Sequence, residues 1–175
     1  MIVAVSVCLW LVACAIFDLK KREVPPALTL PPLFGAVLWT AFTGKPAAAL
    51  FVLLLFILAD VSPRMSGFAG GLQAVIFCLG LATSPEPGLV VTSMLAALGI
   101  WGLWTFGKMG GADAQVLLTL ALIFGPSILL PITLAGGVQG LVSLLVRKKT
   151  IPYMVSILTG MSVFLWMQLI HSPIF

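Results

Sequence analysis

Long apolar runs, separated by short breaks of glycine, proline and charged residues, occupy almost the whole chain. Because a helix rises about 1.5 Å per residue, roughly 20 apolar residues cross a hydrocarbon core of about 30 Å. Backbone polar groups in lipid must be bonded within their own segment, which favours helices over other elements. The pattern therefore predicts an all-α polytopic membrane protein in which residues 1–175 form a single transmembrane domain. About eight transmembrane helices are expected, at 2–18, 27–43, 46–62, 67–83, 88–106, 110–125, 127–146 and 152–171.

The composition agrees with lipid as the main solvent of the chain. Hydrophobic residues make up 61% of the sequence and charged residues only 8%, which is far from the balance of a water-soluble domain. The net charge of +4 is not arranged as a basic stripe interleaved with aromatic residues. The lipid bilayer is therefore a predicted partner, and nucleic acid is not.

The basic residues indicate how the chain is oriented. Eight of the nine lysines and arginines fall in the breaks after the first, third, fifth and seventh predicted helices, and Lys45 is the exception. Cytoplasmic loops of membrane proteins carry such an excess of positive charge. This alternation predicts a multi-pass protein of the cell membrane with its amino terminus outside and these loops in the cytoplasm.

Cysteine and histidine spacing gives no reason to expect a metal site. The three cysteines, Cys8, Cys14 and Cys78, lie inside apolar runs and form no Cys-x-x-Cys or Cys/His pattern. The first apolar run begins at residue 2 without a basic region before it or a small-residue cleavage site after it. We therefore expect a retained helix there and not a removable signal peptide.

Two aspartates, Asp18 and Asp113, are the leading candidates for chemistry. An ionisable residue at membrane depth is costly, so its presence is itself a functional hypothesis. Asp18 closes the first predicted helix and Asp113 lies about one turn into the sixth, so both are expected at the cytoplasmic interface. Carboxylates at one depth on two packed helices can share a single water. In an aspartyl protease one carboxylate removes a proton from that water while the other, protonated, donates to the scissile carbonyl. The sequence leaves open which of the two acts as the base.

The segments around the two aspartates resemble the motifs of a known family. Residues 18–25 read Asp-Leu-Lys-Lys-Arg-Glu-Val-Pro, similar to the Asp-x-x-x-x-x-(Ile/Val)-Pro signature of type IV prepilin peptidases and archaeal preflagellin peptidases. Residues 110–114 read Gly-Gly-Ala-Asp-Ala, similar to the Gly-x-Gly-Asp signature of the same membrane aspartyl proteases. Ala112 stands where the second glycine is usual, and Gln115 stands where many members have lysine.

The resemblance implies an aspartic endopeptidase with Asp18 and Asp113 as its catalytic residues. It implies removal of short basic leader peptides from pilin-like or archaellin-like precursors at the cytoplasmic membrane face. It also implies that cleavage needs no metal or organic cofactor. Longer bacterial members carry an added cytoplasmic region with methylating activity, and because this chain has no such region we expect cleavage alone.

Gly110 and Gly111 have two possible roles. Without a Cβ they allow a close approach of backbone to an extended substrate beside Asp113, which makes them candidate substrate-binding residues. They also fit helix packing through small residues, as in the Gly107-x-x-x-Gly111 pattern. Both roles can hold together.

Two other functions compete with the protease interpretation. A small ion-coupled transporter also keeps carboxylates in the membrane, but it is expected to place them near the midplane and to show internal repeats. A non-catalytic scaffold derived from the peptidase family is the other alternative, which the changes at Ala112 and Gln115 leave open. Only the peptidase is expected to cut a pilin-like precursor.

Overall fold

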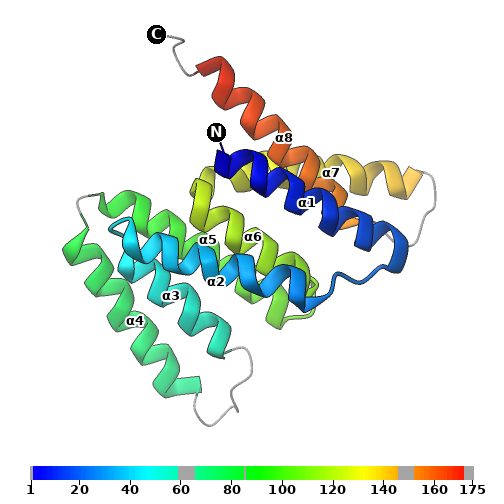
Figure 1. Cartoon of the computed structure of the whole chain (residues 1–175). Helices are drawn as coiled ribbons and strands as arrows, with labels where there is room; N and C mark the ends of the chain where they lie inside the picture. The colour runs from blue at the N-terminus through cyan, green and yellow to red at the C-terminus, as the bar shows by residue number, and fades with distance from the viewer. Residues whose placement is uncertain (1, 59–65, 85, 146–151, 172–175) are drawn as a thin grey trace. The chain divides into compact units, whose positions relative to one another are not determined.

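The computed structural model describes residues 2–58, 66–84, 86–145 and 152–171, and in these ranges the chain is helical apart from short turns. The helices are α1 Ile2–Lys21, α2 Pro26–Phe42, α3 Pro46–Leu58, α4 Ser66–Thr83, α5 Pro87–Thr105, α6 Gly111–Phe124, α7 Leu129–Leu145 and α8 Tyr153–His171, with a short 3-10 turn at Pro126–Ile128 (Figure 1). The all-α prediction is confirmed. Most described ends lie within two residues of the expected ones, but α1 continues three residues past the expected end at residue 18. The expected ends at residues 62 and 146 lie outside the described residues.

The helices have the lengths and surfaces of a multi-pass membrane protein. In the described part of the chain, four segments are long and apolar enough to cross a membrane: Ile2–Lys21, Pro87–Thr105, Pro126–Ser143 and Tyr153–Ile170. The other four helices are apolar but give shorter apolar stretches. Large apolar side chains stay exposed on most helices, as lipid-facing residues do in a membrane protein. The count of eight crossings and the external amino terminus stay predictions.

The chain divides into two compact units. The first combines Met1–Leu28 with Ser127–Phe175, so it holds α1, α7 and α8, and the second is Thr29–Pro126. Segments from the two ends of the sequence therefore form one unit, and the continuous segment between them forms the other. The prediction of a single domain over residues 1–175 stays a prediction.

In the first unit, α8 packs closely against α7 and also contacts α1 (Figure 1). Gly160 makes the approach to α7 possible, because a Cβ at this position would lie 2.4 Å from the Cα of Ile132. Small residues allow helix backbones in membranes to come this close. Near the start of α8, Gln139 of α7 accepts a hydrogen bond from the Ser156 hydroxyl and donates one from Nε2 to the Pro152 carbonyl at 3.3 Å. Apolar contact and polar bonds together fix α8 on α7.

Two consecutive prolines interrupt the hydrogen bonding in the first turns of α2. Pro32 has no N–H to offer the carbonyl of Leu28, four residues before it. The indole N–H of Trp10 in α1 donates to that carbonyl instead, at 2.7 Å. The side chain from α1 thus satisfies a backbone group that the proline leaves without its helical partner.

In the second unit, α4 packs against α3 and α5, and α5 packs against α6. Gly80 of α4 meets both neighbours, because a Cβ there would lie 2.9 Å from Met94 of α5 and 3.0 Å from Ala47 of α3. The amide of Gln73 in α4 donates to the Phe51 carbonyl of α3 at 3.3 Å. In α6 the residues from Val116 to Leu120 form a continuous buried run, so the middle of the helix that carries Asp113 is buried.

Candidate active site

Asp18 lies in the last turn of α1, at the point where the helix ends. The helix ends at the left-handed residue Arg22, whose φ is 57° and whose N–H bonds the Asp18 carbonyl at 3.0 Å. Such a residue after the last turn satisfies a free carbonyl and redirects the chain. The side chain of Asp18 is half-buried, whereas Lys20, Lys21 and Arg22 are exposed.

The carboxylate of Asp18 is held by the amino-terminal end of α8. Its Oδ2 accepts a hydrogen bond from the backbone N–H of Met154 at 3.2 Å, across 136 residues of sequence. Met154 is the second residue of α8, and the first N–H groups of a helix have no acceptor within it. Asp18 therefore caps α8 from another helix, and the positive end of the α8 dipole lies beside the carboxylate.

The basic segment after Asp18 has a contact of its own with α1. The Nζ of Lys21 lies 5.8 Å from the centroid of the Phe17 ring, within the range of a cation–π interaction. Glu23 is exposed. The described contact of the Asp18 carboxylate is thus with a helix terminus.

Asp113 is the third residue of α6, and its carboxylate turns back toward the start of that helix. Gly110 precedes the helix in an extended conformation, with φ −66° and ψ 147°. A Cβ on Gly110 would lie 3.1 Å from Oδ2 of Asp113, which is tighter than an ordinary contact. The absence of a side chain at Gly110 therefore leaves room for the carboxylate beside the first-turn N–H groups of α6.

Gly111 contacts the indole of Trp104 in α5, and a Cβ there would lie 3.2 Å from Nε1. Trp104 stacks on Phe56 of α3, with ring centroids 5.9 Å apart and planes at 29°. Phe56 in turn meets Phe34 of α2 edge to face, with centroids 6.3 Å apart. Gly111 thus packs the start of α6 onto a row of aromatic rings from three other helices.

The expected Gly107-x-x-x-Gly111 packing face is wrong. Gly107 lies in the turn between α5 and α6 with φ +67°, so it does not share a helix face with Gly111. A glycine suits this turn because side chains disfavour the left-handed region. Sequence spacing alone cannot tell a turn glycine from a helical one.

A hydrogen bond that the sequence did not suggest joins α6 to α2. The Thr29 hydroxyl donates to Oε1 of Gln115 at 2.5 Å, and the Thr29 side chain is fully buried. Gln115 lies two residues after Asp113, and Thr29 lies four residues after Pro25. The bond therefore links the segment that follows the first motif to the segment that carries the second.

The structure assigns the two aspartates to different units, Asp18 to the first and Asp113 to the second. Each lies at the amino-terminal end of a helix, Asp113 in its own helix and Asp18 against α8. Their meeting around one water stays a prediction. Among the described residues, no three histidine, cysteine, aspartate or glutamate side chains group as metal ligands.

A model of the type IV leader peptidase family matches residues 5–145 of the chain. The match includes both motif segments, 18–25 and 110–114, and it ends before α8 begins at Tyr153. No curated protein and no solved structure matches the chain.

Proposed function

The chain belongs to the type IV leader peptidase family, and from this premise we propose that it is a membrane aspartyl endopeptidase with Asp18 and Asp113 as its catalytic pair. Family membership makes the chain a leader peptidase and therefore a protease. The proposal adds that its substrates are pilin-like or archaellin-like precursors with short basic leaders. It further adds that cleavage takes place at the cytoplasmic face of the cell membrane, without a cofactor.

The observation that best supports this assignment is that the family match covers both aspartates, and that both carboxylates lie at helix amino termini. Backbone N–H groups and helix dipoles at such ends orient and stabilise a carboxylate. A catalytic carboxylate must be held in a defined position to act on a bound water. The hydrogen bond from Met154 supports this for Asp18, and the position of Asp113 in the first turn of α6 supports it for the second carboxylate.

In the proposed reaction the two side chains share the work of adding water to the scissile peptide bond. One carboxylate takes a proton from the water, and the resulting hydroxide attacks the carbonyl carbon. The other carboxyl group donates its proton to the carbonyl oxygen, which gives a neutral tetrahedral intermediate. The carbon–nitrogen bond then breaks, and the leaving amine takes up the proton that the first carboxylate had removed from water. The second group recovers its proton as the carbonyl re-forms.

Gly110 and Gly111 serve different parts of this site in the proposal. Gly110 is exposed, extended and next to the Asp113 carboxylate, so a substrate backbone can approach it closely. Gly111 faces Trp104, and its lack of a side chain keeps the start of α6 against the aromatic row. Both glycines are assigned to substrate binding, Gly110 by contact and Gly111 by holding Gly110 in place.

The test is cleavage of a purified pilin-like precursor by the protein in lipid vesicles, comparing the parent with Asp18→Asn and Asp113→Asn. Asparagine removes the charge of the carboxyl group but keeps an oxygen that can accept the hydrogen bond from Met154. The Asp18 variant should therefore keep its fold while it loses activity. Loss of one member of the pair is expected to slow cleavage by about 10²–10⁴-fold.

Glu86→Gln is the matched control, because it makes the same chemical change at an exposed acid that caps no helix through its side chain. This variant should cleave at the parent rate. Continued cleavage of the precursor by Asp18→Asn or Asp113→Asn would rule out the proposed aspartic mechanism. A parent protein that leaves the precursor uncut would favour the non-catalytic scaffold.

A further inference from the structure

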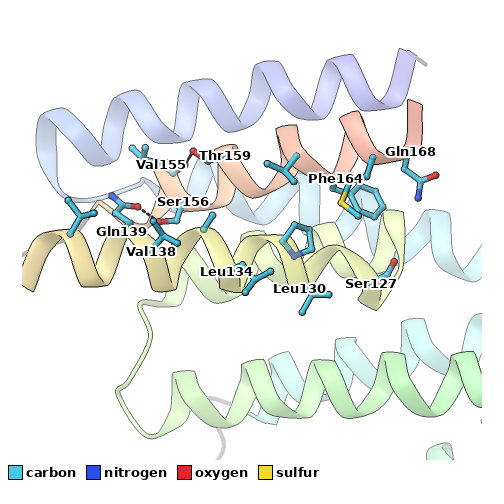
Figure 2. Close-up of a pocket in the computed structure, with 15 residues that line it drawn as sticks. Ser127, Leu130, Leu134, Val138, Gln139, Val155, Ser156, Thr159, Phe164 and Gln168 are labelled. Carbon is cyan, nitrogen blue, oxygen red and sulfur yellow. Dashed lines mark hydrogen bonds between the residues drawn. The ribbon is translucent and has the colours of Figure 1, made fainter. Parts of the chain in front are cut away.

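An open groove of about 970 Å³ runs between α7 and α8 in the first unit (Figure 2). Ten of its fifteen lining residues are apolar. They include Leu130, Leu134 and Val138 from α7, and Val155, Val163 and Phe164 from α8. The groove belongs wholly to residues from Ser127 onward, and its α8 wall lies beyond the segment that the family model matches.

The two ends of the groove differ from its middle. Gln139 and Ser156, hydrogen-bonded to each other, lie at one end, and Ser127 and Gln168 lie at the other (Figure 2). The α8 wall runs from Val155 to Gln168, which at about 1.5 Å per residue spans roughly 20 Å. An apolar groove of this length with polar ends fits one face of a helix of about a dozen apolar residues.

The end of the groove at Ser156 adjoins the candidate catalytic residue Asp18. Val155 and Ser156 line this end, and the N–H of Met154, the residue just before them, bonds the Asp18 carboxylate. Whatever lies in the groove therefore starts beside Asp18 and continues along α8 away from it. The groove therefore gives a substrate that is cut next to Asp18 an apolar surface along which its membrane-embedded part can extend.

We propose that the groove between α7 and α8 holds the apolar helix that follows the cleavage site of the precursor, with the scissile bond at the Asp18 end. This inference rests on the proposed function and adds where the substrate lies. Side chains of the precursor helix pack against the aliphatic walls. The amide of Gln139 and the hydroxyl of Ser156 lie where the precursor leaves the apolar groove for the reaction site.

Two leucines of α7 provide a matched pair for the test. Leu134 lines the groove and is 63% exposed, whereas Leu141 does not line it and is 61% exposed. Leu134→Trp places a bulky ring in the groove, and Leu141→Trp adds the same ring elsewhere on the same helix. Because both side chains are exposed, neither change overpacks the protein interior.

The assay compares two substrates for each variant in lipid vesicles. One is the full precursor, and the other is a soluble peptide that spans the leader and the cut but lacks the apolar helix. For Leu134→Trp, the ratio of kcat/KM for the precursor to kcat/KM for the peptide should fall at least tenfold, mainly through a higher KM. For Leu141→Trp, this ratio should match the parent. Equal ratios in all three proteins would overturn the proposal while leaving the peptidase function intact.

A photo-crosslinking phenylalanine analogue at position 134 or 141 gives an independent readout. It is placed in Asp113→Asn protein, which retains uncut precursor. The analogue at 134 should crosslink to the apolar helix of the precursor, and the analogue at 141 should not. Crosslinks from 134 to lipid alone, or to a second copy of this chain, would overturn the proposal. If the parent cuts neither substrate, the proposed function fails first and this inference fails with it.

Discussion

The close contact between α7 and α8 predicts that Gly160→Ala destabilises the protein. The added Cβ would lie 2.4 Å from the Cα of Ile132, 2.7 Å from its backbone N and 2.8 Å from its Cγ1. Two of these three atoms belong to the α7 backbone, so a change of side-chain rotamer does not relieve the clash. Because carbon atoms pack at about 3.5–4.0 Å, the two helices must separate locally by about 1 Å or more.

The magnitude follows from two opposing effects. Overpacking of a tight interface costs about 1–3 kcal/mol, and a backbone clash belongs at the upper end of this range. Alanine is the better helix former and returns up to about 1 kcal/mol. The cost of overpacking exceeds the gain in helix propensity. We therefore expect the free energy of unfolding to fall by about 1–2 kcal/mol.

The measurement is unfolding by SDS in mixed micelles, followed by tryptophan fluorescence. Gly137→Ala is the control, because Gly137 lies in α7 and a Cβ there meets nothing within 4 Å. This variant should be as stable as the parent or more stable, by up to about 1 kcal/mol. If Gly160→Ala proves as stable as Gly137→Ala, the contact between the two backbones is not as close as described.

Three further predictions concern the candidate site. Gly110→Ala should lower cleavage by about tenfold with little change in stability, because its Cβ would lie 3.1 Å from Oδ2 of Asp113 and displace the carboxylate. Thr29→Val and Gln115→Leu, made singly and together, should show a coupling free energy of about 0.5–1.5 kcal/mol in unfolding experiments, because they share one hydrogen bond. Asp18→Ala should lower the free energy of unfolding by about 0.5–2 kcal/mol, as loss of a helix cap does. Asp18→Asn should lower it less, because its amide oxygen can still accept the hydrogen bond from Met154.

Each of these predictions has its own contrary outcome. Gly102→Ala is the control for Gly110→Ala, because a Cβ at Gly102 meets nothing within 4 Å. Equal cleavage rates for these two variants would mean that the lack of a side chain at Gly110 does not determine where the Asp113 carboxylate lies. Strictly additive effects of the Thr29 and Gln115 substitutions would mean that their hydrogen bond contributes no stability. Equal unfolding free energies for the alanine and asparagine variants of Asp18 would mean that its contact with α8 is not a cap.

The helices could be predicted from the sequence because lipid leaves the backbone little choice. A long apolar run must form a helix, and the breaks at Gly125, Pro126 and Pro152 mark where one helix ends and another begins. The start of α6 was also predictable within a residue, which placed Asp113 correctly in its first turn. The end of α1 was not, because it depends on Arg22 adopting a left-handed conformation.

The partners of the candidate site residues could not be read from the sequence. Met154 and Asp18 are 136 residues apart, and Thr29 and Gln115 are 86 apart, so only tertiary packing brings each pair together. Gln115 was visible as a departure from the usual lysine, but nothing near it indicated Thr29 as its partner. The motifs indicate the candidate catalytic side chains, whereas packing determines which groups hold them.

The two parts of the first unit give α8 a role in the site that its own sequence does not suggest. Helix α8 has no acidic residue in its first turn, yet its free N–H groups need an acceptor. Asp18 supplies it, so the position of a candidate catalytic carboxylate is tied to the position of α8. The contact at Gly160 sets how closely α8 lies on α7, six residues beyond Met154 along a stiff helix. Since a misplacement of about 1 Å can cost about 10²-fold in rate, we expect the packing of α8 on α7 to affect the proposed cleavage reaction even though it is distant from the reacting bond.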